Sequence, residues 1–357
     1  MIKLLVVDDS ALVRKFVGQV FAEEADFQVE FARSGAEALA RLAEVVPDVI
    51  TLDVHMPGMD GLECLDRIMV ERPCPVVMVS SQTAEGADAT LEALRLGAVD
   101  VMPKPGGAVS LHIDEWGPEL VAKVRAAAGA RLKSTLRLQE RVRHRIGARR
   151  TAAPRPSPGA PAPQRAAGQG LVLVGTSTGG PPALEALLSG LPAHFPWPIL
   201  VAQHMPASFT GALARRLDGI CALKVVEVSR PVGLEPGVAY IGRGDADIVV
   251  SRRPGGLAAM AAPGRQGYLW RPSVDRLVRT AMDQLPAAQL IGVLMTGMGD
   301  DGAAAMAELH AQGGRTIAEA EETAVVWGMP GELAKAGGAD WVLPLPSIAS
   351  RLLELAP

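Results

Sequence analysis

The sequence predicts an α/β fold in two domains, on three observations. The chain has 357 residues, more than one domain usually contains. In residues 1–128, short β-branched apolar runs alternate with longer helical patterns, which is typical of βα repeats around a parallel sheet. The alternation stops in a stretch rich in Arg and then in Pro and Ala, and it resumes near Gly170. We therefore expect domains at 1–128 and 169–357, joined by a linker at 129–168.

The N-terminal domain contains five apolar runs that we expect to form a five-stranded parallel sheet. The runs are Ile2 to Val7, Phe27 to Phe31, Val49 to Leu52, Val76 to Val79 and Ala98 to Met102. A helical pattern follows each run. The last helix is expected to begin near Ile113 and to include Pro118 to Ala128.

The C-terminal domain is expected to be a doubly wound α/β domain with a small antiparallel excursion. Its clearest buried strands are Leu171 to Val174, Pro198 to Ala202 and Leu290 to Met295. Between the second and the third lie short strand-like runs broken by Gly and Pro, such as Val225 to Val228 and Asp247 to Val250. We expect these runs, within Leu223 to Met260, to leave the main sheet and pair in antiparallel.

Composition and charge exclude several classes of protein. Hydrophobic residues make up 48% of the chain and charged residues 21%, which is ordinary for folded domains. The formal net charge is -4, whereas proteins that bind nucleic acid usually carry a clear excess of basic residues. The arginines at 131–150 have neither aromatic residues between them nor a binding motif. We expect no nucleic-acid partner.

Cysteine usage and hydropathy indicate a reducing compartment. The three cysteines, Cys64, Cys74 and Cys221, lack the paired spacing of zinc sites and disulfide frameworks. The first apolar run is too short before Asp8 for a signal peptide, and no later segment approaches the roughly 18 apolar residues of a membrane span. We expect a cytoplasmic protein without membrane insertion.

Polar residues stand where the N-terminal strands end. Asp8 and Asp9 end the first strand, Asp53 the third and Ser80 the fourth, and Lys104 follows the fifth. Taken singly, each Asp could be a helix N-cap and the lysine a solvated charge. Together they occupy the edge of a parallel sheet where ligands bind.

Three carboxylates in one crevice would repel one another, and Mg²⁺ relieves this while leaving positions for phosphate oxygens. We expect Asp8, Asp9 and Asp53 to hold the metal and Asp53 to attack phosphorus as nucleophile. The hydroxyl of Ser80 and the ammonium of Lys104 are expected to bind the new phosphoryl oxygens.

Three segments resemble the receiver domain of bacterial response regulators: Val6 to Ser10, Leu52 to Gly61, and Lys104-Pro105. The resemblance implies a flavodoxin-like fold and a cognate histidine kinase as phosphodonor. It implies that Asp53 is phosphorylated, that Asp8 and Asp9 are the acidic pair, that Ser80 is the switch hydroxyl and that Lys104 senses the phosphoryl group. Val101 stands where many receivers carry an aromatic switch residue.

In the C-terminal domain, a glycine-flanked serine follows a strand and precedes a helical pattern. Ser177 lies in Gly175-Thr-Ser-Thr-Gly-Gly180, and the helix is expected from Ala183. This fits a nucleophile serine in a G-x-S-x-G turn, with helix N–H groups available for an oxyanion. Such a turn can also cradle a phosphate, although the Gly-Lys-Ser/Thr of a P-loop is absent here.

A base and an acid for this serine are available at the ends of neighbouring strands. His204 follows the strand Pro198 to Ala202 and is better placed than the other histidines. Asp300 and Asp301 lie beyond the strand Leu290 to Met295, and either could orient the imidazole. One of the two is expected to be the N-cap of the next helix.

Four segments resemble the catalytic domain of the chemotaxis protein-glutamate methylesterase. They are Ser-Thr-Gly-Gly at Ser177, Gln-His-Met-Pro at Gln203, Arg-Pro-Ser-Val-Asp at Arg271 and Thr-Gly-Met-Gly-Asp-Asp-Gly at Thr296. The resemblance selects Asp301 as the third member beside Ser177 and His204. Thr176 stands where many members have alanine.

This resemblance implies a phosphorylation-activated hydrolase of chemotaxis adaptation. Its substrates would be glutamate γ-methyl esters on methylated chemoreceptors, with release of methanol, and it would also deamidate receptor glutamines. No cofactor is expected for the esterase reaction. The N–H groups of Met298 and around Ser177 are the expected oxyanion donors.

Two other functions are compatible with part of this pattern. A receiver-coupled DNA-binding regulator would need a basic helix-turn-helix module after the linker, which the sequence lacks. A phosphorylation-gated adaptor with an inactive esterase fold would not need competent residues at all three positions. A methanol-release assay on methylated receptor separates the enzyme from the adaptor, because only the enzyme hydrolyses the methyl ester.

Overall fold

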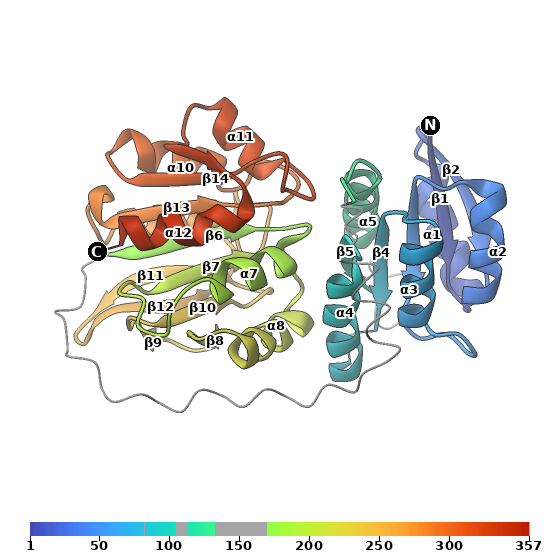
Figure 1. Cartoon of the computed structure of the whole chain (residues 1–357), viewed down its shortest axis with the longest axis horizontal. Coiled ribbons are helices and arrows are strands. Elements are labelled where there is room, and N and C mark those ends of the chain that lie inside the picture. Colours follow the sequence, from blue (N-terminus) through green and yellow to red (C-terminus); the bar gives the residue numbers. More distant parts are fainter. Residues whose placement is uncertain (82, 105–112, 133–169, 357) are drawn as a thin grey trace.

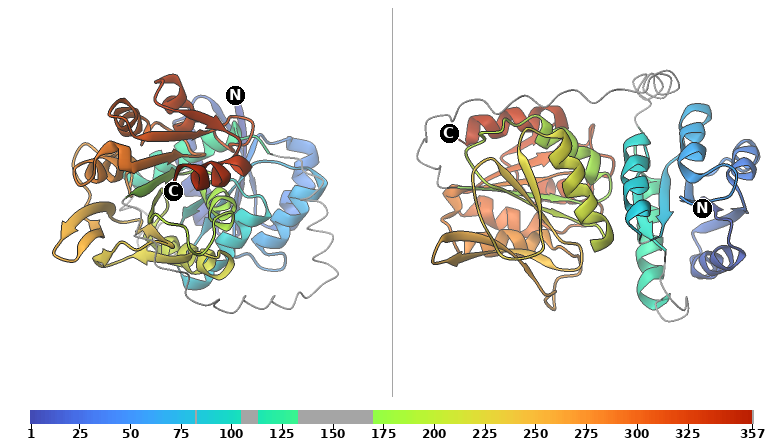
Figure 2. Two further views of the ribbon diagram at one scale, coloured as in Figure 1. Left: turned by 60° about the vertical axis from the view of Figure 1, so that its left-hand side comes forward. Right: turned by 90° about the horizontal axis from the view of Figure 1, so that it is seen from below.

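The structure, a computed structural model, describes residues 1–81, 83–104, 113–132 and 170–356. Two domains lie side by side in Figure 1, and the view from below in Figure 2 shows the same arrangement. Helices α4 (Ala84–Leu96) and α5 (Ile113–Ala128) of the first domain face the second domain. Of the expected linker at 129–168, only residues 129–132 belong to the described part, and residues 133–168 lie outside it.

The first domain has the predicted five-stranded parallel sheet, in the order β2-β1-β3-β4-β5. The strands are β1 (Ile2–Val7), β2 (Phe27–Ala32), β3 (Val49–Asp53), β4 (Val76–Ser80) and β5 (Asp100–Pro103). Because all five strands run in one direction, their carboxyl ends share one edge of the sheet. This edge is where the polar residues of the sequence pattern lie.

Helices cover both faces of this sheet. One face packs against α1 (Ala11–Ala22) and α5, and the other against α2 (Gly35–Val45), α3 (Gly61–Glu71) and α4. Four of these helices begin after a side chain that accepts a backbone N–H, which satisfies part of the open first turn. The capping residues are Ser10 for α1, Ser34 for α2, Asp60 for α3 and Thr83 for α4.

The second domain is built on a seven-stranded parallel sheet in the order β15-β14-β13-β6-β7-β10-β8. The strands are β6 (Leu171–Thr176), β7 (Ile199–Gln203), β8 (Lys224–Val228), β10 (Val238–Gly242), β13 (Leu290–Leu294), β14 (Arg315–Glu319) and β15 (Trp341–Leu343). A 3-10 turn at Ala287–Gln289 precedes β13. The central strands are buried on both faces, as their continuous apolar runs predict.

Helices cover both faces of the second sheet as well, which confirms the doubly wound prediction. Alternate strand residues form two hydrophobic clusters, one on each face. One cluster includes α7 (Gly180–Ser189), α8 (Ala207–Ile220) and α12 (Leu345–Leu355). The other includes α9 (Val274–Met282), α10 (Ala303–Ala311) and α11 (Met329–Lys335).

The expected antiparallel excursion is present, but part of it was assigned wrongly. A three-stranded antiparallel sheet has the order β11-β12-β9, formed by β9 (Val232–Gly233), β11 (Asp247–Arg253) and β12 (Gly256–Ala262). The run Val225 to Val228 belongs instead to β8, which pairs in parallel with β10 in the main sheet. A short run broken from its neighbours by Gly and Pro does not reveal which strand it will pair with.

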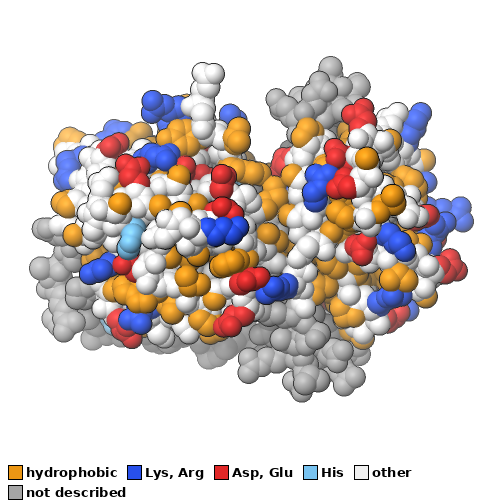
Figure 3. Space-filling view, turned by 90° about the horizontal axis from the view of Figure 1, so that it is seen from above, with side chains coloured by type: hydrophobic (Ala, Val, Ile, Leu, Met, Phe, Trp, Pro, Cys, Tyr) orange, Lys and Arg blue, Asp and Glu red, His pale blue; other side chains and the backbone are white. Residues whose placement is uncertain are grey.

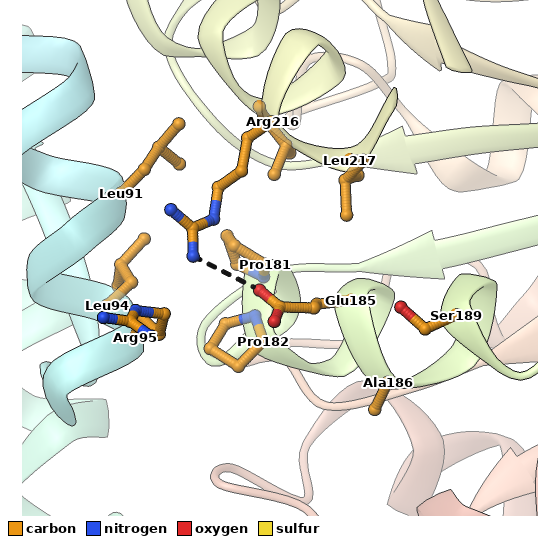
Figure 4. Close-up of a pocket in the computed structure, with 11 residues that line it drawn as sticks. Leu91, Leu94, Arg95, Pro181, Pro182, Glu185, Ala186, Ser189, Arg216 and Leu217 are labelled. Carbon is orange, nitrogen blue, oxygen red and sulfur yellow. Dashed lines mark ion pairs between the residues drawn. The ribbon is translucent and has the colours of Figure 1, made fainter. Parts of the chain in front are cut away.

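One part of the junction between the domains is formed by α4 on one side and by α7 and α8 on the other. A cavity of about 300 Å³ lies there, lined by apolar side chains such as Leu91 and by arginines from both domains. Figure 4 shows Arg216 of α8 directed at Glu185 of α7, at 3.5 Å. Arg216 also lies 3.6 Å from Glu92 of α4. The two domains are therefore joined by charged as well as apolar contacts.

The surface agrees with the modest net charge. On the face seen in Figure 3, basic and acidic side chains are interspersed over both domains. Among the described residues, no helix combines the length and the apolar character needed to cross a membrane.

Candidate functional site

The acidic residues predicted at the N-terminal strand ends lie together. The ligand oxygens of Asp8, Asp9 and Asp53 are all within 4.8 Å of one another, with Asp8 and Asp53 buried and Asp9 exposed. The ammonium of Lys104 lies 2.9 Å from Asp8 Oδ2 and 2.7 Å from Asp53 Oδ2. The lysine thus partly neutralises a cluster whose charges would otherwise repel.

Burial sets the protonation of this cluster. Burial raises the pKa of Asp53, and the charge of Asp8 adds to the effect, while the bond and charge of Lys104 only partly oppose it. Burial lowers the pKa of Lys104, but its bonds to Asp53 and Asp8 outweigh this and the net pKa is raised. Lys104 therefore offsets only part of the cost of burying the charge of Asp53.

Ser80 stands at the same edge but its hydroxyl is directed toward α4. The residue is fully buried, and its Oγ donates to the backbone oxygen of Gly86 at 3.2 Å. Gly86 lies in the first turn of α4, the helix that contacts the second domain. The phosphoacceptor edge is therefore hydrogen-bonded to an interface helix.

In the second domain, Ser177 directly follows β6 and is almost completely buried. The helix after it begins at Gly180, three positions before the expected Ala183, because Gly179 turns the chain with φ of +78°. A Cβ at Gly180 would lie 1.9 Å from Gln203 Oε1, so only glycine allows this approach. The turn at Ser177 is thus shorter and tighter than the sequence pattern suggested.

Two polar residues that the sequence analysis left without a role hold this turn. Gln203, at the end of β7, donates to the backbone oxygens of Ser177 and His204 at 3.0 Å each and accepts from Thr176 Oγ1 at 2.6 Å. Thr296 accepts from Ser177 N through its backbone oxygen and donates to Thr178 O at 2.8 Å. Both are polar residues at the ends of buried strands, and this position in the sequence could have indicated that they hold the turn.

His204 and Asp301 form a buried pair. His204 Nε2 lies 2.8 Å from Asp301 Oδ2, and both side chains are almost fully buried. The other ring nitrogen, Nδ1, is buried without a hydrogen-bond partner among the described residues. His204 and Ser177 line one cavity of about 680 Å³. No hydrogen bond joins their side chains in the described part of the chain, which is common before substrate tightens a site.

Asp301 is held by the start of α9. It accepts from Val274 N at 2.7 Å, Asp275 N at 3.1 Å and Ser273 Oγ at 3.0 Å. Burial acts to raise the pKa of Asp301, but the hydrogen bond and charge of His204 and these backbone N–H groups outweigh it, so the net pKa is lowered. Asp301 therefore stays ionised beside the imidazole.

The helix that follows Asp301 is capped from elsewhere, so the expectation that Asp300 or Asp301 is its N-cap was wrong. The N-cap residue of α10 is Gly302, and Asp275 Oδ1 accepts from Gly302 N at 3.1 Å and Ala305 N at 3.0 Å. Asp301 thus accepts backbone N–H groups at the start of α9, and Asp275 of α9 accepts backbone N–H groups at the start of α10. This reciprocal arrangement explains why two distant sequence motifs are needed for one acid.

The first domain forms part of the cavity that contains Ser177. Pro103, Pro118 and Ala122 line it together with Ser177 and His204. The first domain also bonds directly to the nucleophile turn: Gly179 N donates to Val99 O at 3.1 Å.

The same contact includes a buried hydrogen bond between Thr178 Oγ1 and Asp100 Oδ2. Asp100 Oδ1 also accepts from Lys123 Nζ of α5 at 3.0 Å. Burial lowers the pKa of Lys123, but the negative charge of Asp100 outweighs it and the net pKa is raised. A charged pair of the first domain is thus bonded to the residue after Ser177.

Two family models match the chain, and they divide it as the fold does. The model for the response regulator receiver domain matches residues 4–113, and the model for CheB methylesterase matches residues 172–352. The crystal structure of the Thermotoga maritima CheB methylesterase catalytic domain is 38% identical, covers 52% of this chain and 98% of its own, and has a TM-score of 0.50.

Similar proteins match over nearly the full length. A protein-glutamate methylesterase/protein-glutamine glutaminase 2 of Rhodopseudomonas palustris is 58% identical over 99% of this chain and 98% of its own. A protein-glutamate methylesterase/protein-glutamine glutaminase 3 of Rhodospirillum rubrum is 52% identical over 99% of this chain and 95% of its own. The chain therefore belongs to the CheB methylesterase family and carries a response regulator receiver domain ahead of the methylesterase domain.

Proposed function

We propose that this protein is a phosphorylation-activated protein-glutamate methylesterase that hydrolyses glutamate γ-methyl esters on chemoreceptors and also deamidates receptor glutamines. The observation that carries the proposal is the His204–Asp301 pair beside Ser177 in one cavity. Family membership and the names of the relatives support the substrate. The test is methanol release from methylated receptor, with and without a small phosphodonor. An adaptor with an inactive esterase fold would release none.

We propose a separate role for each nitrogen of His204. Asp301 accepts from Nε2, which leaves the buried and unpartnered Nδ1 to take the proton of Ser177. Ser177 Oγ then bonds to the ester carbonyl carbon, and the proton passes from Nδ1 to the methoxy oxygen, which leaves as methanol. Water attacks the acyl-enzyme by the same proton route and frees the glutamate carboxylate. A glutamine amide follows the same path with ammonia as leaving group.

Backbone N–H groups for the oxyanion are limited to those without another acceptor. Ser177 N and Gly180 N already donate to carbonyl oxygens of the same domain, and Gly179 N, which donates to Val99 O of the receiver domain, becomes a further candidate only when the interface opens. The proposed donors are Thr178 N and Met298 N, which have no acceptor among the described residues, and Met298 lines the cavity. Removing one such donor from a hydrolase costs about 10²- to 10³-fold in kcat.

For the receiver domain we propose that Asp53 accepts a phosphoryl group from a cognate histidine kinase. Three carboxylates with clustered oxygens are a donor set that fits Mg²⁺, and Asp8, Asp9 and Asp53 would hold it. Bound there, the ion would neutralise charge on the phosphoryl oxygens. Asp53 would supply the attacking oxygen, and Lys104, already bonded to Asp53, would pair with the phosphoryl group afterwards.

Phosphorylation would open a closed arrangement. Two connections lead to the methylesterase domain from the sheet edge on which Asp53 lies. Ser80 bonds to the first turn of α4, and Lys104 follows β5, which begins at Asp100 with its bond to Thr178. Movement of either connection toward a phosphoryl group would loosen the interface. Because the second connection does not use an aromatic switch, Val101 is compatible with control.

Asp53→Asn is expected to abolish activation by a small phosphodonor such as acetyl phosphate, while the basal rate stays within about twofold of the parent. Asparagine keeps the volume of Asp53 but cannot form the acyl phosphate. The measurement is the ratio of methanol release with and without phosphodonor. Asp48→Asn, at an exposed carboxylate of the same domain, is the control and should be activated normally. Full activation of Asp53→Asn would contradict the assignment.

Thr178→Val is expected to raise the basal rate about tenfold and to leave the phosphodonor-activated rate within about twofold. Valine keeps the shape and the backbone N–H but removes the hydroxyl that donates to Asp100 across the interface. A hydrogen bond to a charged group stabilises by about 1.5–3 kcal/mol, enough to shift a closed population at least tenfold. If the basal rate does not rise, this bond does not hold the closed arrangement.

The domain limits of 1–128 and 169–357, the linker between them and a cytoplasmic location remain part of the proposal. The matched ranges support the domain limits and the linker, because they leave residues 114–171 outside both family models, whereas the location is proposed from the sequence alone. The expected partners are methylated chemoreceptors as substrate and the kinase as phosphodonor. The esterase chemistry as derived uses only side chains and backbone of this chain.

A further inference from the structure

Trp270 lies flat against the imidazole of His204. The ring centroids are 5.1 Å apart and the ring planes differ by 9°. Both residues line the cavity that contains Ser177. The aromatic ring therefore contacts the face of the residue that, in the proposed reaction, receives the serine proton.

Trp270 is itself held by the residues around it. It lies between β12 and α9, three positions before Ser273, the N-cap of α9. Ser273 N donates to the buried Asp247 at 2.8 Å, and Ser273 Oγ donates to Asp301. On another side, a Cβ at Gly299 would lie 3.7 Å from Trp270 Cζ2, so the indole packs beside that backbone. The same acid that holds His204 thus also holds the segment that presents Trp270.

The hydrogen bond from His204 to Asp301 leaves one motion of the imidazole open. It fixes the position of Nε2, but the ring can still tilt about that atom and swing Nδ1 away from Ser177. A flat ring contact fixes the plane. In addition, the face of an indole attracts a cation, so it favours the imidazolium that forms when the serine proton is taken.

We propose that Trp270 is a positioning residue of the esterase reaction, which holds the plane of His204 and stabilises its protonated form during catalysis. This inference rests on the proposed function, because it concerns the proton transfer from Ser177. No role in the reaction follows for Trp270 from its sequence position, where it is one aromatic residue in a loop.

The test compares Trp270→Leu and Trp270→Phe in the full chain, activated with phosphodonor and assayed by methanol release from methylated receptor. Leucine keeps an apolar contact but has no ring face, and phenylalanine keeps a smaller face. Trp270→Leu should lower kcat about 3- to 30-fold with KM within about twofold, and Trp270→Phe should recover most of the loss.

The pH profile separates this role from simple support of the loop. Without the ring face the imidazolium forms less readily, so the acid limb of the kcat profile should move to lower pH in Trp270→Leu and less in Trp270→Phe. The charged groups that contact His204 or line its cavity are unchanged in both variants: Asp301, Arg271, Glu119 and Lys123. An unchanged kcat, or a reduced kcat with an unmoved acid limb, would overturn the proposal.

Two further measurements keep the outcome decisive. Trp341→Leu removes a tryptophan from β15, at the far edge of the sheet, and should leave both kcat and the acid limb unchanged. The rate at which a fluorophosphonate probe labels Ser177 should fall in Trp270→Leu as kcat does. If the parent is labelled at Ser177 but releases no methanol, the proposed substrate is wrong, while the labelling rates still support or overturn the role of Trp270.

Discussion

Ser177→Ala is expected to lower methyl ester hydrolysis by about 10³-fold or more, with binding of methylated receptor retained. The reason is that Ser177 supplies the oxygen that bonds to the carbonyl carbon, and alanine has no hydroxyl in its place. Loss of a triad nucleophile in another hydrolase reduces kcat by about 10⁶-fold, with residual catalysis left to the oxyanion donors.

The measurement is the initial rate of methanol release from phosphodonor-activated protein. Ser189→Ala is a matched control, since Ser189 is an exposed serine at the end of α7, the helix that begins at Gly180. It should behave like the parent. If Ser177→Ala keeps activity within about tenfold of the parent, the nucleophile lies elsewhere.

Asp301→Asn is expected to have the second largest effect, a fall of about 10²- to 10⁴-fold in kcat. Asparagine keeps the size of the side chain, and with its amide at the Oδ2 position its oxygen can still accept from Asp275 N and Ser273 Oγ, while Val274 N loses its acceptor. Its amide, however, cannot stabilise the imidazolium and favours the tautomer that places the proton on Nδ1 of His204, the atom that must accept the serine proton.

Asp300→Asn is an unusually close control for this variant. Asp300 precedes Asp301 directly but is exposed, and within the described part of the chain it is bonded only through its backbone oxygen, which accepts from Ala303 N. We expect activity within about twofold of the parent. Equal losses in the two variants would show that the loop, and not the carboxylate, is responsible.

The lowered pKa of Asp301 also predicts the direction in which the free energy of unfolding changes with pH. Ionised Asp301 stabilises the folded state above its ordinary value of 3.8, and this contribution is lost as the pH falls through the lower folded pKa. The Asn variant lacks the contribution at every pH. The difference in unfolding free energy between parent and Asp301→Asn should therefore shrink in acid.

The receiver site could be predicted almost completely from the sequence, whereas the esterase site could be predicted only in part. Asp53 ends a strand, and Asp8 and Lys104 directly follow strands of the same parallel sheet. Because strand ends are visible as apolar runs, the meeting of these residues follows from the fold class. Asp301 is different. It lies beyond the end of β13 in a loop, and its partners are the first residues of α9, a helix that no local pattern connects to it.

Contacts across domains and contacts of single aromatic residues were beyond the sequence for a related reason. The bond between Thr178 and Asp100 joins positions 78 residues apart, in two domains whose docking no hydrophobic periodicity describes. The stack of Trp270 on His204 depends on the path of a loop. Periodicity reports which face of an element is buried, but it does not report which side chain of another element lies opposite.

The reciprocal capping of α9 and α10 has a consequence for how such an enzyme can diverge. Asp301 is held by backbone N–H groups at the start of α9, and Asp275 of α9 in turn accepts backbone N–H groups at the start of α10. The position of Asp301 therefore depends little on the loop side chains around the cavity. At the mouth of the cavity, the exposed Leu269 lines it but takes no part in this exchange of bonds. New receptor preferences can therefore be acquired by substitutions in that mouth while the hydrolytic core is inherited unchanged.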